Sequence, residues 1–204
     1  MRSTLLAMRV LAVLNKKGGA GKTTTAIGIA DGCRRRGLRV GLIDTDPNAS
    51  ASRWLASVPE IDSVPCTSAD LRGLIEGVRD LYDVLIIDSP PNDVAALQAV
   101  AAVADLAIIP LAPTAIEVDQ LPDTVDLIEA AGTPWIVVPV RVRLSTAAGK
   151  TIRDLCSDAG IPVTRSVVPL TEAVARSFGE LPPGLSYMPL LGELLDEHLL
   201  VGAP

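Results

Sequence analysis

The chain has 204 residues, of which 49% are apolar and only 2% aromatic, so aliphatic side chains and alanine must fill its interior. This length is most simply one domain, residues 1–204, that buries a substantial core. One histidine, His198, and three scattered cysteines argue against histidine-based catalysis, a zinc site and a disulfide framework, and favour a reducing cytoplasm.

The N-terminal residues 1–14 are apolar but lead directly into a polar motif and lack a cleavage-type site, so no signal peptide is expected. Met8 would be a natural start before the first strand, and we expect residues 1–7 to be a short disordered extension. No apolar run approaches the roughly 18–20 residues of a membrane span.

The net charge of −6 hides a strong polarity along the chain. Residues 1–60 hold ten Lys and Arg against four Asp and Glu, and residues 61–138 hold two against thirteen. Residues 139–176 hold six against three, and residues 177–204 have none against four. This balance excludes a protein covered in basic residues but leaves room for one basic face.

Apolar β-type runs alternate with helical patterns, which predicts a doubly wound, mostly parallel α/β sheet with helices on both faces. The expected strands are Val10–Leu14, Arg39–Ile43, Val84–Asp88, Leu106–Leu111, Trp135–Val140 and, from a weaker pattern, Val163–Val168. The expected helices are Lys22–Arg36, Ser50–Ser57, Ala69–Leu81, Val94–Ala104, Val118–Ala131, Ala147–Ala159, Leu170–Phe178 and Leu190–Leu200.

The first motif is the stretch NKKGGAGKT at residues 15–23, which follows a strand and opens into a helix. Strand, glycine-rich turn, Lys-Thr and helix is the order that a phosphate-binding loop requires. Glycines let successive backbone N–H groups converge on phosphate oxygens. Lys22 would place its ammonium against the β- and γ-phosphates, and the Thr23 hydroxyl would hold Mg²⁺. A plain surface turn would not need this strand, helix and spacing.

Two further motifs put carboxylates at strand ends, where open α/β sheets bind ligands. In LIDTDPN, Asp44 and Asp46 end the second strand, and in YDVLIIDSPP four apolar residues precede Asp88. A carboxylate in the position of Asp88 reaches Mg²⁺ through a water. Either motif alone is an ordinary strand end, but in this order behind the loop they indicate a metal–nucleotide site.

These motifs together resemble the deviant Walker A ATPases of the ParA/MinD type, whose loop reads K-G-G-x-G-K-T. The resemblance runs from Met8 to about Leu200 and is nearest to the short plasmid-partition (ParF-like) ParA proteins, which the length and Trp54 after Asp-Thr-Asp-Pro also fit. It implies a P-loop NTPase fold, ATP and Mg²⁺ as cofactors, and hydrolysis of ATP to ADP and phosphate that is weak without a partner.

The resemblance also implies residue roles. Lys17 would be the signature lysine that reaches across a dimer interface to the partner's ATP, and Asp44 would polarise the attacking water. Asp46 would help to shape the switch segment and the metal network at the nucleotide. Asn48 stands where the family usually has Gln. The implied catalytic residues are Lys17, Lys22 and Asp44; the nucleotide-binding residues are Lys17, Gly18, Gly19, Ala20, Gly21, Lys22, Thr23 and Thr24; and the metal-binding residues are Thr23, Asp44 and Asp88.

Two weaker sites concern the base. Arg141 ends a strand where relatives often place the residue that covers adenine, and Pro169 lies in a segment that resembles the wall of the base pocket. Each residue also has a purely structural interpretation: Arg141 as a solvated arginine, and Pro169 as a proline that starts a helix.

As a function, the resemblance implies a positioning ATPase that forms an ATP-sandwich homodimer, binds DNA non-specifically on the nucleoid and is released when a small partner protein stimulates hydrolysis. The cargo would be a plasmid, a chromosome region or a protein body. Arg143, Lys150 and Arg153 are the expected DNA contacts, because Lys150 and Arg153 lie three apart on a predicted helix and aromatic residues for stacking are missing among them. A solvated helix face is the alternative.

Two other functions remain open. A MinD-like membrane-cycling ATPase would end in an amphipathic helix with Lys or Arg, whereas residues 190–201 carry three carboxylates and no Lys or Arg. Anionic lipid would repel this tail, so no membrane partner is expected. A metabolic P-loop ligase of similar fold usually lacks the lysine-rich loop, but composition does not dismiss it.

Overall fold

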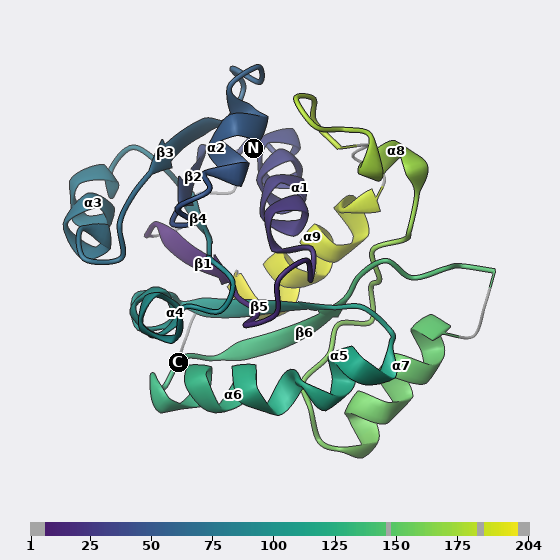
Figure 1. Ribbon diagram of the computed structural model, residues 1–204. Coiled ribbons are helices and arrows are strands. Elements are labelled where there is room, and N and C mark those ends of the chain that lie inside the picture. The colour runs from purple at the N-terminus through teal and green to yellow at the C-terminus, as the bar shows by residue number, and fades with distance from the viewer. Residues whose placement is uncertain (1–6, 146–147, 183–185, 200–204) are drawn as a thin grey trace.

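The computed structural model describes residues 7–145, 148–182 and 186–199. At its centre is a six-stranded sheet whose strands all run parallel, in the order β3-β2-β4-β1-β5-β6 (Figure 1). The strands are β1 (Arg9–Val13), β2 (Val40–Asp44), β3 (Asp62–Pro65), β4 (Val84–Asp88), β5 (Leu106–Leu111) and β6 (Trp135–Pro139).

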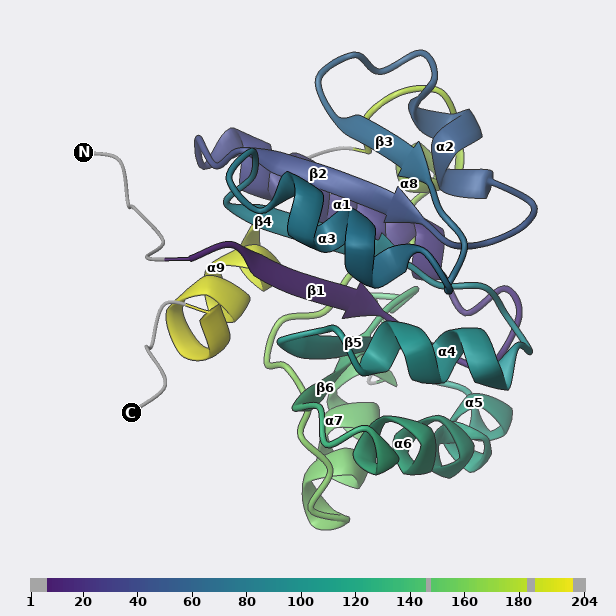
Figure 2. The same cartoon turned by 90° about the vertical axis from the view of Figure 1, so that its left-hand side faces the viewer.

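Helices cover both faces of this sheet. On one face lie α1 (Lys22–Arg35), α2 (Ser50–Leu55) and α9 (Met188–Leu194), and on the other lie α3 (Leu71–Val78), α4 (Val94–Ala101), α6 (Leu121–Ala130) and α7 (Ala148–Asp158). Figure 2 shows α3, α4 and α6 side by side along their face. The predicted class, a doubly wound parallel α/β sheet, is confirmed.

Three short elements complete the described chain: α5 (Ala115–Asp119), α8 (Glu172–Ala175) and the π-helical segment η2 (Leu195–Leu199), which continues α9. Among the described residues, no helix has the length and apolarity needed to cross a membrane.

The central strands are apolar throughout because each of their faces packs against helices. In β1, Leu11 and Val13 join the core cluster under α1, whereas Val10 and Ala12 join the cluster under α4 and α6. All five residues of β4 are buried. This two-sided burial explains why the strands read as continuous apolar runs instead of alternating patterns.

The register of the central strands positions the candidate site. Val13, the last residue of β1, and Asp44, the last residue of β2, both pair with Asp88, the last residue of β4. Because parallel strands end at the same edge of the sheet, two carboxylates from distant parts of the sequence lie directly beside the loop that follows β1.

Helix α1 meets α9 closely because it presents glycine there. A Cβ atom built on Gly28 would lie 2.4 Å from the ring of Tyr187, and one on Gly32 would lie 3.0 Å from Leu191. The contact therefore needs glycine at position 28, and it seats the buried Tyr187 ring against the helix that carries the phosphate-binding loop.

The prediction of a strand over Val163–Val168 is wrong. Within this segment Val163 forms an isolated bridge to Val137, and the flanking Pro169 forms another to Val142. Pro162 and Pro169 flank it, and neither has the N–H group that a ladder needs. Conversely, β3 was not expected from the sequence, because this edge strand is mostly exposed and has no apolar run.

Three helix predictions also need correction. The predicted helix Val118–Ala131 is two helices, α5 and α6, because Pro122 starts a new helix in the first turn of α6. The predicted helix Leu170–Phe178 shortens to the four residues of α8. The last helix begins at Met188, before the expected Leu190, whereas the predicted ends Ala147 and Leu200 lie outside the described residues.

Candidate nucleotide-binding site

The glycine-rich loop joins the end of β1 to the start of α1. Gly19 and Gly21 take φ angles of 74° and 93°, which strain any residue with a side chain. Gly21 directly precedes the first residue of α1, so the helix begins at the loop with its free backbone N–H groups. This is the geometry that binds an anion without a specific side chain.

Lys22 folds back over this loop. Its Nζ atom donates a hydrogen bond to the carbonyl oxygen of Lys17 at 3.0 Å. Burial lowers its pKa, while the nearby charges of Asp88 and Asp46 act in the opposite direction. A largely buried ammonium beside the glycine-rich loop is a strong centre for a multiply charged anion.

Asp88 has a buried carboxylate oxygen whose hydrogen-bonding capacity is not satisfied by the described residues. Its Oδ2 atom accepts a hydrogen bond from the Thr23 hydroxyl at 2.7 Å, but Oδ1 is buried without a hydrogen-bond partner among the described residues. Burial chiefly raises the pKa of Asp88 to about 7, helped by the charges of Asp44 and Asp46 and opposed by the Thr23 hydroxyl and Lys22. A hydroxyl beside an unsatisfied carboxylate oxygen fits a hard divalent cation such as Mg²⁺.

Asp44 is held from two sides. Its Oδ1 accepts from the backbone N–H of Asp46 at 3.1 Å, and its Oδ2 accepts from that of Ser52 in α2 at 2.8 Å. Asp46 in turn accepts from the backbone and the side-chain amide of Asn48. The amide that replaces the usual Gln thus braces the turn, and the Asp44 carboxylate has a fixed orientation beside Asp88.

Lys17 lies on the outer side of the loop. Its Nζ atom forms an ion pair at 3.4 Å with Glu117 of α5, a carboxylate that is only 6% exposed and also accepts from the Ala112 N–H. The neighbouring Lys16 pairs with Asp123 of α6 at 2.7 Å. The sequence did not predict a role for Glu117, and its only signal was an acidic residue between the apolar Ile116 and Val118.

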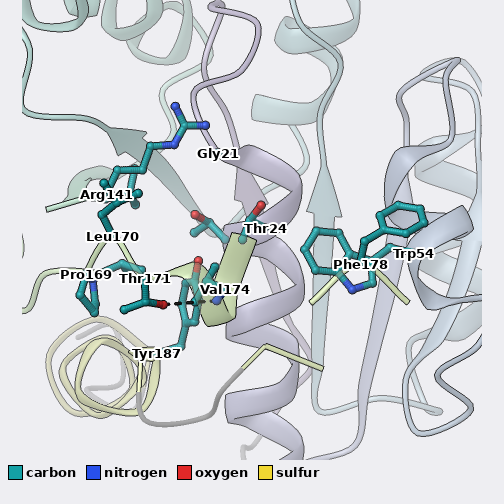
Figure 3. Close-up of a pocket in the computed structure, with 13 residues that line it drawn as sticks. Gly21, Thr24, Trp54, Arg141, Pro169, Leu170, Thr171, Val174, Phe178 and Tyr187 are labelled. Carbon is teal, nitrogen blue, oxygen red and sulfur yellow. Dashed lines mark hydrogen bonds between the residues drawn. The ribbon is translucent and has the colours of Figure 1, made fainter. Parts of the chain in front are cut away.

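A cavity of about 270 Å³ opens beside Gly21 and the first turn of α1 (Figure 3). Arg141 and Pro169, the two residues expected near the base, both line it. Arg141 has a φ angle of 56° and its guanidinium donates to the carbonyl oxygen of Gly19, so it spans the gap between the cavity and the loop. The full lining is Gly21, Thr24, Thr25, Trp54, Val140, Arg141, Val168, Pro169, Leu170, Thr171, Val174, Phe178 and Tyr187.

Comparison with known proteins decides the family. Residues 11–182 match the model of the CobQ/CobB/MinD/ParA nucleotide-binding domain. The chain belongs to this family. The predicted ParA/MinD membership is thereby confirmed, whereas a place among the short plasmid-partition proteins stays a prediction.

A relative of known name supports the same conclusion. Maintenance of carboxysome distribution protein A from Gloeobacter kilaueensis is 34% identical over 194 residues, which cover 91% of this chain and 86% of that protein. This relative matches nearly the whole chain.

Two solved structures share the fold. Cobyrinic acid a,c-diamide synthase from Mycobacterium smegmatis, with bound ADP and magnesium, has a TM-score of 0.77 at 21% identity and covers 96% of this chain and 97% of its own. An ATP complex of McdA from Cyanothece has a TM-score of 0.75 at 19% identity. The match covers 96% of this chain and 99% of the McdA chain.

Several basic residues of the segment expected to contact DNA have partners within the protein. Lys150 of α7 is exposed, and Arg143 is exposed in the preceding turn. Arg153, however, donates to the Arg165 carbonyl oxygen. Two more of the six cations of residues 139–176 have carboxylate partners, Arg165 with Glu197 and Arg176 with Glu172.

Proposed function

We propose that this ParA/MinD-family protein binds ATP with Mg²⁺ and hydrolyses it to ADP and phosphate. The observation that carries the proposal is the convergence of Lys22, the Thr23–Asp88 pair and Asp44 at the mouth of the glycine-rich loop. Backbone N–H groups of residues 18–24 and the Lys22 ammonium would bind the phosphates. Arg141 and Pro169 would enclose the base in the cavity beside α1.

The residues of this chain have distinct parts in the reaction. Thr23 would hold the cation directly, and Asp88 and Asp44 would hold it through water; the cation supplies charge neutralisation at the phosphates. Asp44, fixed by two backbone N–H groups, would orient the attacking water. Among the described residues of the site none is a strong general base, so turnover without a partner would be slow.

The signature lysine suggests how two copies cooperate. Lys22 already serves the phosphates of its own protomer, so Lys17 is available to a second nucleotide. In an ATP-sandwich homodimer it would stabilise transition-state charge in the partner's site, as an arginine finger does. For this, the Lys17 ammonium must leave or share its ion pair with Glu117.

We further propose that the dimer positions a cargo in the cytoplasm on the nucleoid. Arg143, Lys150 and Arg153 of two protomers would contact duplex phosphates without sequence preference, and a small partner protein would stimulate hydrolysis and release the dimer. The named relative maintains carboxysome distribution, which makes a protein body as well as a plasmid or chromosome region a reasonable cargo.

The decisive experiment compares Asp44→Ala and Lys22→Ala with the parent, using nucleotide binding and phosphate release. Asp44→Ala should bind ATP with Mg²⁺ yet lose turnover, whereas Lys22→Ala should lose binding. Turnover at the parent rate in Asp44→Ala would contradict the assigned water site. Adding duplex DNA with each nucleotide then tests the second proposal, since binding should require ATP and weaken with salt.

A further inference from the structure

The wall of the cavity opposite Arg141 and Pro169 is aromatic. Trp54 of α2 and Phe178, in the loop after α8, lie with their ring centroids 5.6 Å apart and their planes at 44°. The Trp54 indole N–H donates to the carbonyl oxygen of Glu180 at 2.7 Å. In Figure 3 these two rings lie on one side of α1, and Arg141 and Pro169 lie on the other.

This gathering stands out in a chain with so few aromatic residues. The protein has five, and three of them, Trp54, Phe178 and Tyr187, line this one cavity. Trp54 and Tyr187 are core residues, but Phe178 is 62% exposed, so burial in the core does not account for the position of Phe178. Aromatic faces are the surfaces on which nucleobases stack, irrespective of base identity. We refer to Trp54, Phe178 and the Glu180 carbonyl as the aromatic bridge.

Helix α2 connects the aromatic bridge to the carboxylate proposed to orient water. The Ser52 N–H in the first turn of α2 donates to Asp44 Oδ2, and Trp54 follows two residues later. Ala51 and Leu55 of the same helix are buried in the core under α1. Over less than one helical turn the backbone has little freedom to absorb a displacement, so a shift of Trp54 moves Ser52 as well.

We propose that Trp54 is a positioning residue that couples the base pocket to Asp44. A nucleobase that packs against the aromatic bridge holds α2 in place, and α2 holds the Asp44 carboxylate in the orientation that the water needs. This rests on the proposed hydrolysis of ATP. It adds that the base governs the rate of the chemical step as well as affinity, because a small displacement of a catalytic group lowers the rate steeply.

The first test uses the two tryptophans of the chain. Trp135 lies at the start of β6, where its indole donates to Glu129, and it does not line the cavity. In Trp135→Phe the fluorescence therefore reports on Trp54 alone. Saturating ATP with Mg²⁺ should change the emission, and ribose 5-triphosphate, which lacks the base, should leave it nearly unchanged. Unaltered emission while equilibrium dialysis shows bound ATP would overturn the proposal.

The second test separates kcat from KM. Trp54→Phe keeps an aromatic ring but removes the N–H donor to Glu180, and Phe178→Ala removes a ring that is 62% exposed. Both should lower kcat for ATP on the order of tenfold with a smaller change in KM. Neither should change kcat for ribose 5-triphosphate, which a merely damaged fold would lower equally.

Trp135→Phe is the matched control and should keep the parent kcat with both substrates. If both bridge variants unfold at the parent temperature and retain kcat for ATP, Trp54 is not a positioning residue, whereas ATP hydrolysis itself stands. If the parent neither binds nor hydrolyses ATP, the proposed function fails and this inference fails with it.

Discussion

The phosphate end and the base end of the candidate site are built in different ways. At the phosphate end, nine consecutive residues, 15–23, form the loop, and the strand register adds Asp44 and Asp88 at the same edge of the sheet. At the base end, the wall is built from α1, α2, the loop after β6, residues 168–178 and Tyr187. The first end depends on local sequence, and the second depends on how the last third of the chain packs over α1.

The largest expected effect tests the phosphate end. Thr23→Ala removes the hydroxyl that donates to Asp88, and a hydrogen bond to a charged group contributes about 1.5–3 kcal/mol. We expect the Mg²⁺-dependent affinity for any nucleoside triphosphate to fall roughly 100-fold, measured by titration of a fluorescent ATP analogue with and without Mg²⁺. Thr23→Ser keeps the hydroxyl and should retain the affinity; equal losses in both variants would remove Thr23 from the metal site.

The next largest effect is expected at the base end, where a substitution in α1 would displace a residue that lines the cavity. Gly28→Ala puts a methyl group into the Tyr187 ring, and overpacking of this kind costs about 1–3 kcal/mol. Thermal unfolding should therefore begin at a lower temperature, and the distorted cavity should bind ATP less well while inorganic tripolyphosphate binds as before. Gly73→Ala in α3 meets no atom within 4 Å and serves as the control. Equal loss of both ligands would show that the two ends are not separable.

A third prediction concerns pH at the phosphate end. The folded-state pKa of Asp88 is raised to about 7 from the ordinary 3.8, so the folded apo protein binds this proton more tightly than the unfolded chain. The stabilisation is complete below pH 3.8 and is lost as the pH rises through 7, at no more than about 1.4 kcal/mol per pH unit.

Mg²⁺ needs the ionised carboxylate, so its affinity should rise with pH up to about 7 and then level off. Mg²⁺ titrations of the ATP complex at several pH values would measure this slope, together with urea unfolding of the apo protein. The side chain in Asp88→Asn does not titrate. The dependence on pH should therefore disappear both for the Mg²⁺ affinity and for the free energy of unfolding. Persistence of the slopes in this variant would assign them to another group.

The smallest expected effect lies at the outer side of the loop. Glu117→Gln keeps an acceptor for the Ala112 N–H but removes the charge that holds Lys17. Solvent reaches this ion pair on its Lys17 side, which is 31% exposed, and we therefore assign it up to about 1 kcal/mol. The ATP-dependent dimer should tighten by up to roughly fivefold, measured by light scattering over a concentration series. Asp123→Asn, which frees Lys16 instead, should leave the dimer unchanged. A weaker dimer in Glu117→Gln would mean that Glu117 orients Lys17 toward the partner.

The local sequence alone determined the strands β1, β2, β4, β5 and β6 and the helix α1 to within one or two residues. Each strand is a short apolar run, and α1 lies between the Lys-Thr of the loop and Gly37. The local sequence also determined the phosphate loop, since the loop geometry follows from consecutive glycines. Asp44 and Asp88 were predictable as neighbours because equal strand ends follow from the parallel order.

Only the tertiary structure decided the rest. Edge strand β3 has no apolar signal, and the bridges of residues 163 and 169 depend on their neighbours in space. Glu117 meets Lys17 across 100 residues of sequence, and Trp54 meets Glu180 across 126. Such contacts arise where separate elements pack, and no period or motif within either segment encodes the partner. The sequence therefore determined the loop that we propose to bind phosphate, and the packing of the C-terminal third decided the walls of the cavity beside it.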